Sequence, residues 1–408
     1  MSGVVLARAL ATEAFGTFVL VNALLWFSVG LQTALTVRPL VLEGAALDRA
    51  AFRRLFRTYL AIQATSLFVT AVLVAVVAWV LAPLREHAVV VALTAALMQA
   101  QELCRRVLYT RSRMRMALLN NFVNYDLQAA VLAIAALVSG LSLDAALWII
   151  AATSLLAVAL GAWQLRDLVG PLGDELGEVV RRCLSIGAWS AGSAALTALA
   201  YEAYPVLLQA FHGLTPTAGL GVIRQLLGPI NLVLRPIESQ YLPRAARALA
   251  DQGEAGQRRV LWRAAAVSGP PYLIYLLALA FAPGPILELI YGERYLLFAD
   301  VVRVFAAAEL LGLPLAVLSV AASTRGLQRL LFVANVWNAV VILAIGVAVV
   351  GSFGLAGVAI SSAAATGGRL AIVGLGLARV PAASGRARAH AAPSAATRGR
   401  GVSGELDH

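Results

Sequence analysis

The sequence contains no lysine; all 32 of its basic residues are arginine. The phosphate-binding loop GxxxxGK[ST] requires a lysine, so this chain cannot hydrolyse ATP by that route. Cysteine is nearly as scarce, since Cys104 and Cys183 stand alone without the spacing of a metal site. The four histidines are scattered along the chain. We therefore expect neither cysteine chemistry, nor a metal, nor a cofactor.

Charge of either sign is also scarce. Only 13% of the residues are charged, about half the share in an ordinary soluble domain. Hydrophobic residues make up 61% of the chain, and the mean hydropathy is +0.83. A soluble protein of 408 residues has no core large enough to bury so much apolar side chain. The composition therefore predicts a protein whose solvent is lipid.

Apolar runs that could cross a bilayer recur along the whole chain. A helix of about 20 apolar residues spans roughly 30 Å of hydrocarbon, and it satisfies its own backbone there. We predict an all-α polytopic membrane protein with about 11 transmembrane helices. The predicted spans are 14–36, 59–82, 87–104, 119–139, 143–165, 184–208, 215–235, 264–283, 300–323, 330–350 and 354–378.

The arginines indicate which side of the membrane each connection faces. When the connections are assigned alternately to the two sides, 26 arginines fall on one side, and the other side receives only Arg8, Arg85 and Arg294. The positive-inside rule makes the first side cytoplasmic. Most of these arginines need no role beyond anchoring the topology. Because the Ala- and Arg-rich composition is typical of high-GC prokaryotes, we expect a multi-pass protein of the prokaryotic cytoplasmic (inner) membrane.

The chain repeats one stretch half its length apart. Residues 110–124 align without a gap with residues 324–338, and Gly140-Leu141 then aligns with Gly354-Leu355. The identities are Thr110, Arg111, Arg115, Asn121 and Asn124 with Thr324, Arg325, Arg329, Asn335 and Asn338. Chance similarity between two Ala- and Leu-rich segments is the alternative, but the matches fall on Arg, Asn and Gly. The repeat predicts two parallel halves, a common transporter plan with the pathway between them.

The N-terminus conflicts with an eleven-span count. A cytoplasmic C-terminal tail would place the N-terminus outside, without a signal peptide to carry it there. Residues 1–16 resemble the last turns of a helix, so we expect a complete plan of twelve spans whose first is missing here. The predicted domains are an N-terminal bundle of five spans plus this remnant (1–165), a cytoplasmic linker (166–183), a C-terminal bundle of six spans (184–378) and a disordered tail (379–408).

Three segments resemble a known family in their order and spacing. They are ARALATEAFGTFVLVNAL (7–24), PILELIYGERYLLFADVVRVFAAAELLG (285–312) and FGLAGVAISSAAA (353–365). They resemble helix junctions of the Wzx-type polysaccharide and oligosaccharide flippases, members of the multidrug, oligosaccharidyl-lipid and polysaccharide exporter superfamily. The chain departs from that family in lacking the first helix, which lines the family's central cavity.

The resemblance implies two pseudo-symmetric helical bundles around a central cavity. It also implies a function: flipping of polyprenyl-diphosphate-linked oligosaccharide across the cytoplasmic membrane for surface polysaccharide synthesis. The implied partners are the lipid-linked glycan, membrane lipid, and the polysaccharide polymerase and glycosyltransferases of the same pathway. We expect a monomer and no nucleic acid.

Cationic side chains at mid-membrane depth are the candidates for binding such an anionic head group. A charge there is costly, so each needs a partner or a water-filled lining. Arg224 and Arg369 lie deepest, and Arg303 lies nearer the outer end of its span. The resemblance places the 215–235 span against the cavity, which makes Arg224 the first candidate. The alternatives are an ion pair of Arg224 with an acid such as Glu202, and pairing or snorkelling of Arg369.

Acids within the spans offer a different chemistry. Asp126 and Glu309 could carry a coupling proton, because burial favours the neutral form of a carboxyl group. The repeated asparagines, spaced three residues apart on one helix face, are better interpreted as hydrogen-bonding links between helices than as glycan contacts.

Two other functions compete with the flippase. An ion-coupled antiporter of drugs or small molecules in the same superfamily would favour acids over arginines in the cavity, whereas the two deepest charges are arginines. A membrane-embedded glycan polymerase or glycosyltransferase would need a large outer loop with catalytic groups. Since the longest outer connection covers only about residues 284–299, we expect the chain not to be an enzyme.

Overall fold

The structure, a computed structural model, describes residues 2–44, 47–138, 140–169 and 201–379, together with the single positions 177, 181 and 198. Within these residues every regular element is a helix. Among these described residues, consecutive helical elements join into eight runs long and apolar enough to cross a membrane, and two of these runs, Ile230–Phe281 and Gln328–Arg379, are 52 residues long. The predicted all-α polytopic fold is therefore confirmed. The predicted linker and tail fall almost entirely outside the described residues.

Each 52-residue helix is divided by a glycine. Gly253 and Gly354 have φ of 67° and 57°, a left-handed conformation that is costly for residues with a Cβ. Each break turns one helix into two passes, so the described helices follow ten of the eleven predicted spans. Most of the remaining predicted span, 184–208, lies outside the described residues.

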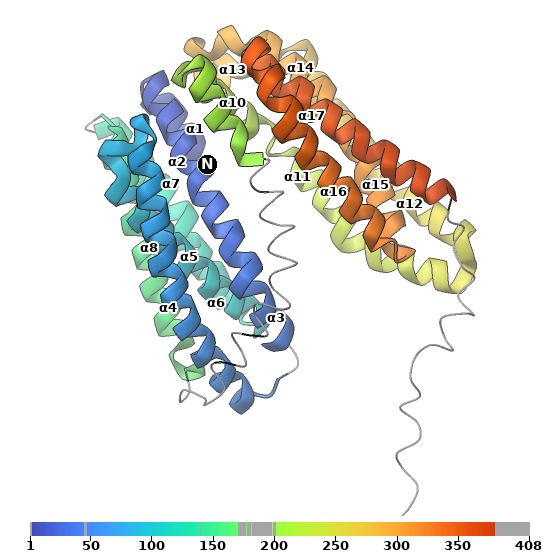
Figure 1. The fold of residues 1–408 in the computed structure, drawn as a ribbon, viewed down its shortest axis with the longest axis horizontal. Coiled ribbons are helices and arrows are strands. Elements are labelled where there is room, and N and C mark those ends of the chain that lie inside the picture. Colours follow the sequence, from blue (N-terminus) through green and yellow to red (C-terminus); the bar gives the residue numbers. More distant parts are fainter. Residues whose placement is uncertain are drawn as a thin grey trace, which may run out of the picture.

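The first group of helices covers residues 2–168 (Figure 1). Its elements are α1 (Ser2–Ala9), α2 (Thr12–Gln32), η1 (Thr33–Val37), α3 (Arg38–Gly44), α4 (Arg49–Val80), η2 (Ala82–His87), α5 (Ala88–Thr110), α6 (Met114–Asn121), η3 (Phe122–Leu127), α7 (Gln128–Val138), α8 (Leu143–Leu165) and η4 (Arg166–Leu168). The side chains of Asp48 and Ser142 cap the N-termini of α4 and α8. They accept hydrogen bonds from the backbone amides of Ala51 and Ala145, which have no acceptor within the first turn of their helix.

The second group begins with a helical stretch at 201–212. It continues with α10 (Leu214–Leu227), α11 (Ile230–Pro236), η5 (Ile237–Tyr241), α12 (Leu242–Phe281), α13 (Pro283–Tyr291), η6 (Glu293–Phe298), α14 (Ala299–Glu309), α15 (Gly312–Thr324), α16 (Gln328–Val340), η7 (Val341–Ile345) and α17 (Gly346–Arg379). Large apolar side chains stay exposed on its outer face, for example Ile274 at 68% and Phe281 at 81%, as lipid-facing helices require.

The sequence repeat corresponds to a repeated local structure. Thr110 ends α5 and Thr324 ends α15, and the arginine that follows is the C-cap in both places. Arg111 donates to the carbonyl of Leu47 and lies over the Phe52 ring, while Arg325 donates to Gln257. Each arginine thus fixes its helix end to a neighbouring element. Gly140 and Gly354 both have positive φ, so the paired glycines share a backbone requirement.

The two groups meet along α2 and α10. Gly16 of α2 lies so close to α10 that a Cβ there would come within 2.3 Å of the Leu214 carbonyl oxygen, and a Cβ on Gly221 would come within 2.2 Å of Val19. The groups converge near α1, α10 and α13, and they diverge toward α3 and the far end of α12 (Figure 1). The converging end carries Arg8 and Arg294, two of the three arginines that the sequence assigns to the outside.

Reciprocal hydrogen bonds fasten the groups at this converging end, which the arginine distribution predicts to be external. Arg294 of η6 donates to the carbonyls of Leu10 at 2.6 Å and Arg8 at 3.1 Å, while Arg8 donates to the carbonyl of Leu289 at 2.8 Å. The hydroxyl of Tyr295 donates to the carbonyl of Ala7 at 3.1 Å. We call this set the external clasp. It joins the two groups at the end where they converge.

Replacing Arg294 by alanine is expected to favour opening at the external end. Hydrogen bonds from a charged donor contribute about 1.5–3 kcal/mol each, so losing two, about 3 kcal/mol together, should raise the population of the open form by roughly a hundredfold. The measurement is labelling of Ala7→Cys, a fully buried position, by an impermeant thiol reagent in a variant with Cys104 and Cys183 replaced by serine.

Arg303→Ala is the matched control for the clasp. This outer arginine binds Asp300 and the carbonyl of Ala280, all within the second group. Its replacement should leave labelling of Ala7→Cys unchanged. Equal labelling with and without Arg294 would show that the clasp does not hold the outer end closed.

A charged cavity within the second helix group

A cavity of about 510 Å³ lies inside the second group, between α10, α11, α14, α15, α17 and the 201–212 helix. Its charged lining residues are Arg224, Arg235, Glu238, Glu309 and Arg369, and Ser362 adds a hydroxyl group. Tyr201 and Tyr204 line it from the 201–212 helix. Arg224 and Arg369 lie deep within their predicted spans, where a charge is costly, so their arrangement points to function. Arg235 lies at the end of the predicted 215–235 span.

Arg224 on α10 is fixed by the neighbouring 201–212 helix. Its Nη1 donates to the Glu202 carboxylate at 2.9 Å and its Nη2 to the Tyr201 carbonyl at 2.5 Å. The guanidinium also lies 4.2 Å from the centre of the Tyr201 ring, a cation–π distance. Residues 202 and 224 are each eleven residues from Gly213, the turn between the two helices, which brings them to the same depth. The ion-pair geometry proposed for Arg224 is therefore present, on the wall of the cavity.

Arg369 on α17 differs in having spare hydrogen-bonding capacity. Its Nε is buried and has no hydrogen-bond partner among the described residues. A buried donor without an acceptor costs free energy, and a charged one costs more. Glu238, on η5, lines the same cavity but forms no ion pair with Arg369 within 4.0 Å. An anionic ligand in the cavity would supply the missing acceptor.

Glu309 is placed at the end of α14, on the cavity wall. Its backbone carbonyl accepts a hydrogen bond from the Tyr272 hydroxyl, while its carboxylate forms no ion pair with any described residue. A carboxylate without a basic partner is costly in hydrocarbon, so this group is suited to carry a proton. Nearby, the hydroxyls of Tyr204 and Ser361 lie 2.8 Å apart, which ties α17 to the 201–212 helix and orients this side of the cavity.

The structure brings together four of the six site residues predicted from sequence. Arg224, Arg369 and Glu309 line the cavity, and Glu202 holds Arg224 there. Arg303 lies outside it and pairs with Asp300. Asp126 is exposed in η3 of the first group.

Sequence reasoning missed Arg235 and Glu238 as cavity residues. They lie beside Pro236, where α11 passes into the π-helical turn η5, and this turn determines which face each presents. The sequence feature that could have indicated them is an arginine followed three residues later by an acid, with a proline between the two.

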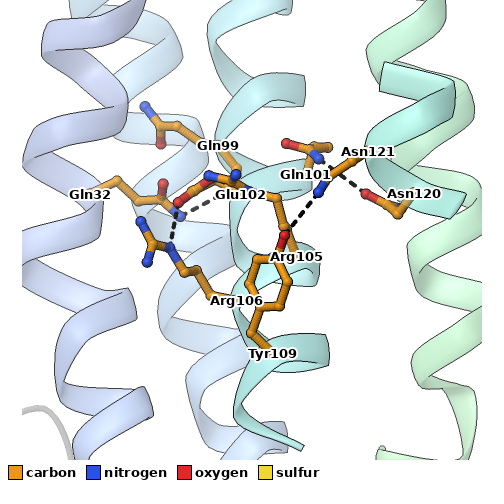
Figure 2. A network of polar contacts seen from close by, with 9 residues as sticks. All are labelled: Gln32, Gln99, Gln101, Glu102, Arg105, Arg106, Tyr109, Asn120 and Asn121. Carbon is orange, nitrogen blue, oxygen red and sulfur yellow. Dashed lines mark hydrogen bonds and ion pairs between the residues drawn. The ribbon is translucent and has the colours of Figure 1, made fainter. Parts of the chain in front are cut away.

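The first group contains a separate polar network, shown in Figure 2. The buried carboxylate of Glu102 on α5 binds Arg105 and Arg106 of the same helix. Gln101 donates to Asn120 at 3.0 Å, and Asn121 donates to the Tyr109 hydroxyl at 2.9 Å. These bonds join α5 to α6. Of the four repeated asparagines, Asn121 makes such a link between helices, while the bond of Gln101 is to the neighbouring Asn120. Because Glu102 is already paired twice, the network stabilises the bundle more than it offers a site.

These observations define a polytopic membrane protein of two helix groups, with repeated local structure and a charged cavity inside the second group. No protein-family model and no curated protein sequence matches the chain. Solved structures match it in fold. An inward-facing multidrug resistance transporter of the MATE family, in the MOP superfamily, is 14% identical with a TM-score of 0.72, over 96% of this chain and 93% of that one.

Two further structures show the same fold. The MATE multidrug transporter DinF-BH is 12% identical with a TM-score of 0.63, over 93% of this chain and 90% of that one. An outward-facing MATE transporter of the MOP superfamily is 14% identical with a TM-score of 0.56, over 96% and 91%. The chain thus has the fold of the MATE transporters, as the superfamily resemblance predicted.

Proposed function

We propose that this protein transports polyprenyl-diphosphate-linked oligosaccharide from the inner to the outer leaflet of a prokaryotic cytoplasmic membrane, for surface polysaccharide synthesis. The observation that carries the proposal is the arginine-lined cavity, above all Arg369, whose Nε has no partner among the described residues. A diphosphate has several strong acceptor oxygens, and guanidinium groups bind phosphate in a planar, bidentate manner.

The cavity also limits how such a cargo would bind. Its volume of about 510 Å³ lies in the range of small-molecule sites, which is too small for a long glycan. The diphosphate and the first sugar would occupy it, and the remaining sugars would lie outside. Arg224 would contribute the N–H donors that Glu202 and Tyr201 leave free, since a guanidinium carries five.

A second candidate function is an ion-coupled antiporter of drugs or other small molecules. Glu309 favours it, because a cavity carboxyl that no described basic residue pairs could exchange a proton for a cationic substrate. The matched structures described as multidrug transporters favour it as well. The formal charges of Arg224, Arg235 and Arg369 are balanced by Glu202, Glu238 and Glu309, so overall charge does not decide between the two functions.

Genetic complementation tests the first proposal. Expression in a host that lacks its own polysaccharide flippase should restore surface polysaccharide and remove the accumulated lipid-linked oligosaccharide. Dye efflux from the same cells tests the second. Efflux of cationic dyes without any restored polysaccharide would favour the antiporter.

A further inference from the structure

A groove lies on the face of the second group opposite to the charged cavity. It occupies about 410 Å³ between α12 and α15, and apolar side chains make up nearly all of its lining, including Leu261, Ala265, Leu313 and Val317. Its neighbours on α12, such as Val267 and Ile274, are exposed as lipid-facing side chains. The groove therefore opens on the hydrocarbon of the membrane.

At one end the groove changes from apolar to basic. A second pocket of about 860 Å³ continues it and shares Arg258, Leu261, Trp262 and Leu318 with it. Arg258, Arg259 and Arg325 line this pocket together with the acid Glu254. The sidedness of the arginines places this end at the cytoplasmic surface. Trp262, 68% exposed, lies at the junction, where amphipathic rings prefer the membrane interface.

The three arginines of this pocket differ in how they are held by neighbouring side chains. Arg325 donates to Gln257 at 3.1 Å and lies 3.6 Å from Glu254, so it is held in the floor of the pocket. Arg259 donates to Gln252 at 3.3 Å, and the exposed Arg258 forms no hydrogen bond or ion pair with a described residue. Two arginines at the rim of an interfacial pocket attract anionic head groups.

We propose that this groove binds an anionic phospholipid of the cytoplasmic leaflet. One acyl chain lies between α12 and α15, and the phosphate is bound by Arg258 and Arg259 above Arg325. The apolar groove supplies the contact for the chain, and the charge at its mouth selects the head group. The site is separate from the transported cargo, because α15 forms the wall between groove and cavity: Leu315 and Ser319 face the cavity, whereas Val317 and Leu318 face the groove.

The test is phospholipid binding to the purified, delipidated full chain, measured by native mass spectrometry and by thermal stabilisation. Phosphatidylglycerol should bind more tightly than phosphatidylcholine. Arg258→Ala/Arg259→Ala should weaken phosphatidylglycerol binding roughly 30-fold, about fivefold for each arginine near the membrane surface. Ala265→Trp fills the groove without changing a charge, and it should abolish the tight binding of phosphatidylglycerol.

Arg247→Ala is the matched control, since Arg247 is an exposed arginine of α12 that does not line the pocket. It should bind phosphatidylglycerol as the unmodified chain does. Equal loss in Arg247→Ala would overturn the proposal in favour of general surface charge. Full stabilisation by glycerol 3-phosphate alone, or preferential binding of polyprenyl phosphate over phosphatidylglycerol, would also overturn it.

Discussion

Arg369→Glu is expected to abolish glycan export while the protein still reaches the membrane. Arg369 forms no ion pair with a described residue that its replacement would break, although the new carboxylate would share the cavity with Glu238 and Glu309, which is why membrane abundance has to be followed. At about 4 Å and an effective dielectric constant near 20, an attraction of about 4 kcal/mol becomes a repulsion of the same size. The measurement is surface polysaccharide in a flippase-deficient host, with membrane abundance determined in parallel.

Two control variants make this result interpretable. Arg369→Lys keeps the charge but loses the planar fork, so it should retain partial export. Arg303→Glu reverses a charge outside the cavity, beside Asp300, and should export normally. Normal export by Arg369→Glu at unchanged abundance would contradict a role for Arg369 in binding the cargo.

The second large effect is expected at Arg224, because this side chain forms an ion pair with Glu202 and also lines the cavity that we propose binds the cargo. Arg224→Glu places a carboxylate against Glu202, which removes a bond of 2.9 Å and leaves two like charges together. Breaking a fully buried ion pair in this way costs about 3–5 kcal/mol, and this half-buried pair should approach the lower end of that range. Both membrane abundance and export should therefore fall.

The exchanged pair Glu202→Arg/Arg224→Glu separates the two demands. It restores the ion pair with its direction reversed, so abundance should recover. Export should stay low, because the carboxylate now lines the cavity and the guanidinium has moved to a position that does not. Recovery of export together with abundance would show that Arg224 is needed for the structure alone.

Much of the fold could be predicted from the sequence because lipid imposes simple rules. Apolar runs predict the spans, and the repeat from Thr110 to Gly140 recurs as matching helix ends and glycine conformations. The sides that the arginines assign to the connections stay a prediction. The two passes of each 52-residue helical run were predicted as separate spans, 215–235 and 264–283 in one and 330–350 and 354–378 in the other. Only the backbone shows that Gly253 and Gly354 turn the chain without a connecting loop.

The candidate site was predictable only in part. Depth along a span follows from residue number, which is why Arg224, Glu202 and Arg369 were found. The direction in which a side chain points depends on helix rotation, and π-helical turns change that rotation. The turn η5 turns Glu238 toward the cavity, and η3 contains Asp126, which the structure leaves exposed in the other group. Arg303 lies near one end of its helix, where it forms an ion pair with Asp300 of the same helix.

The central claim concerns the cargo, and reconstitution tests it most directly. The purified chain in liposomes would be given a polyprenyl-diphosphate oligosaccharide with a fluorescent sugar, and a glycosidase added outside would report its transfer between leaflets. We expect transfer that depends on the protein and that Arg369→Glu abolishes. Failure of the folded protein to move this lipid, together with uptake of a cationic dye driven by a pH gradient, would contradict a flippase function.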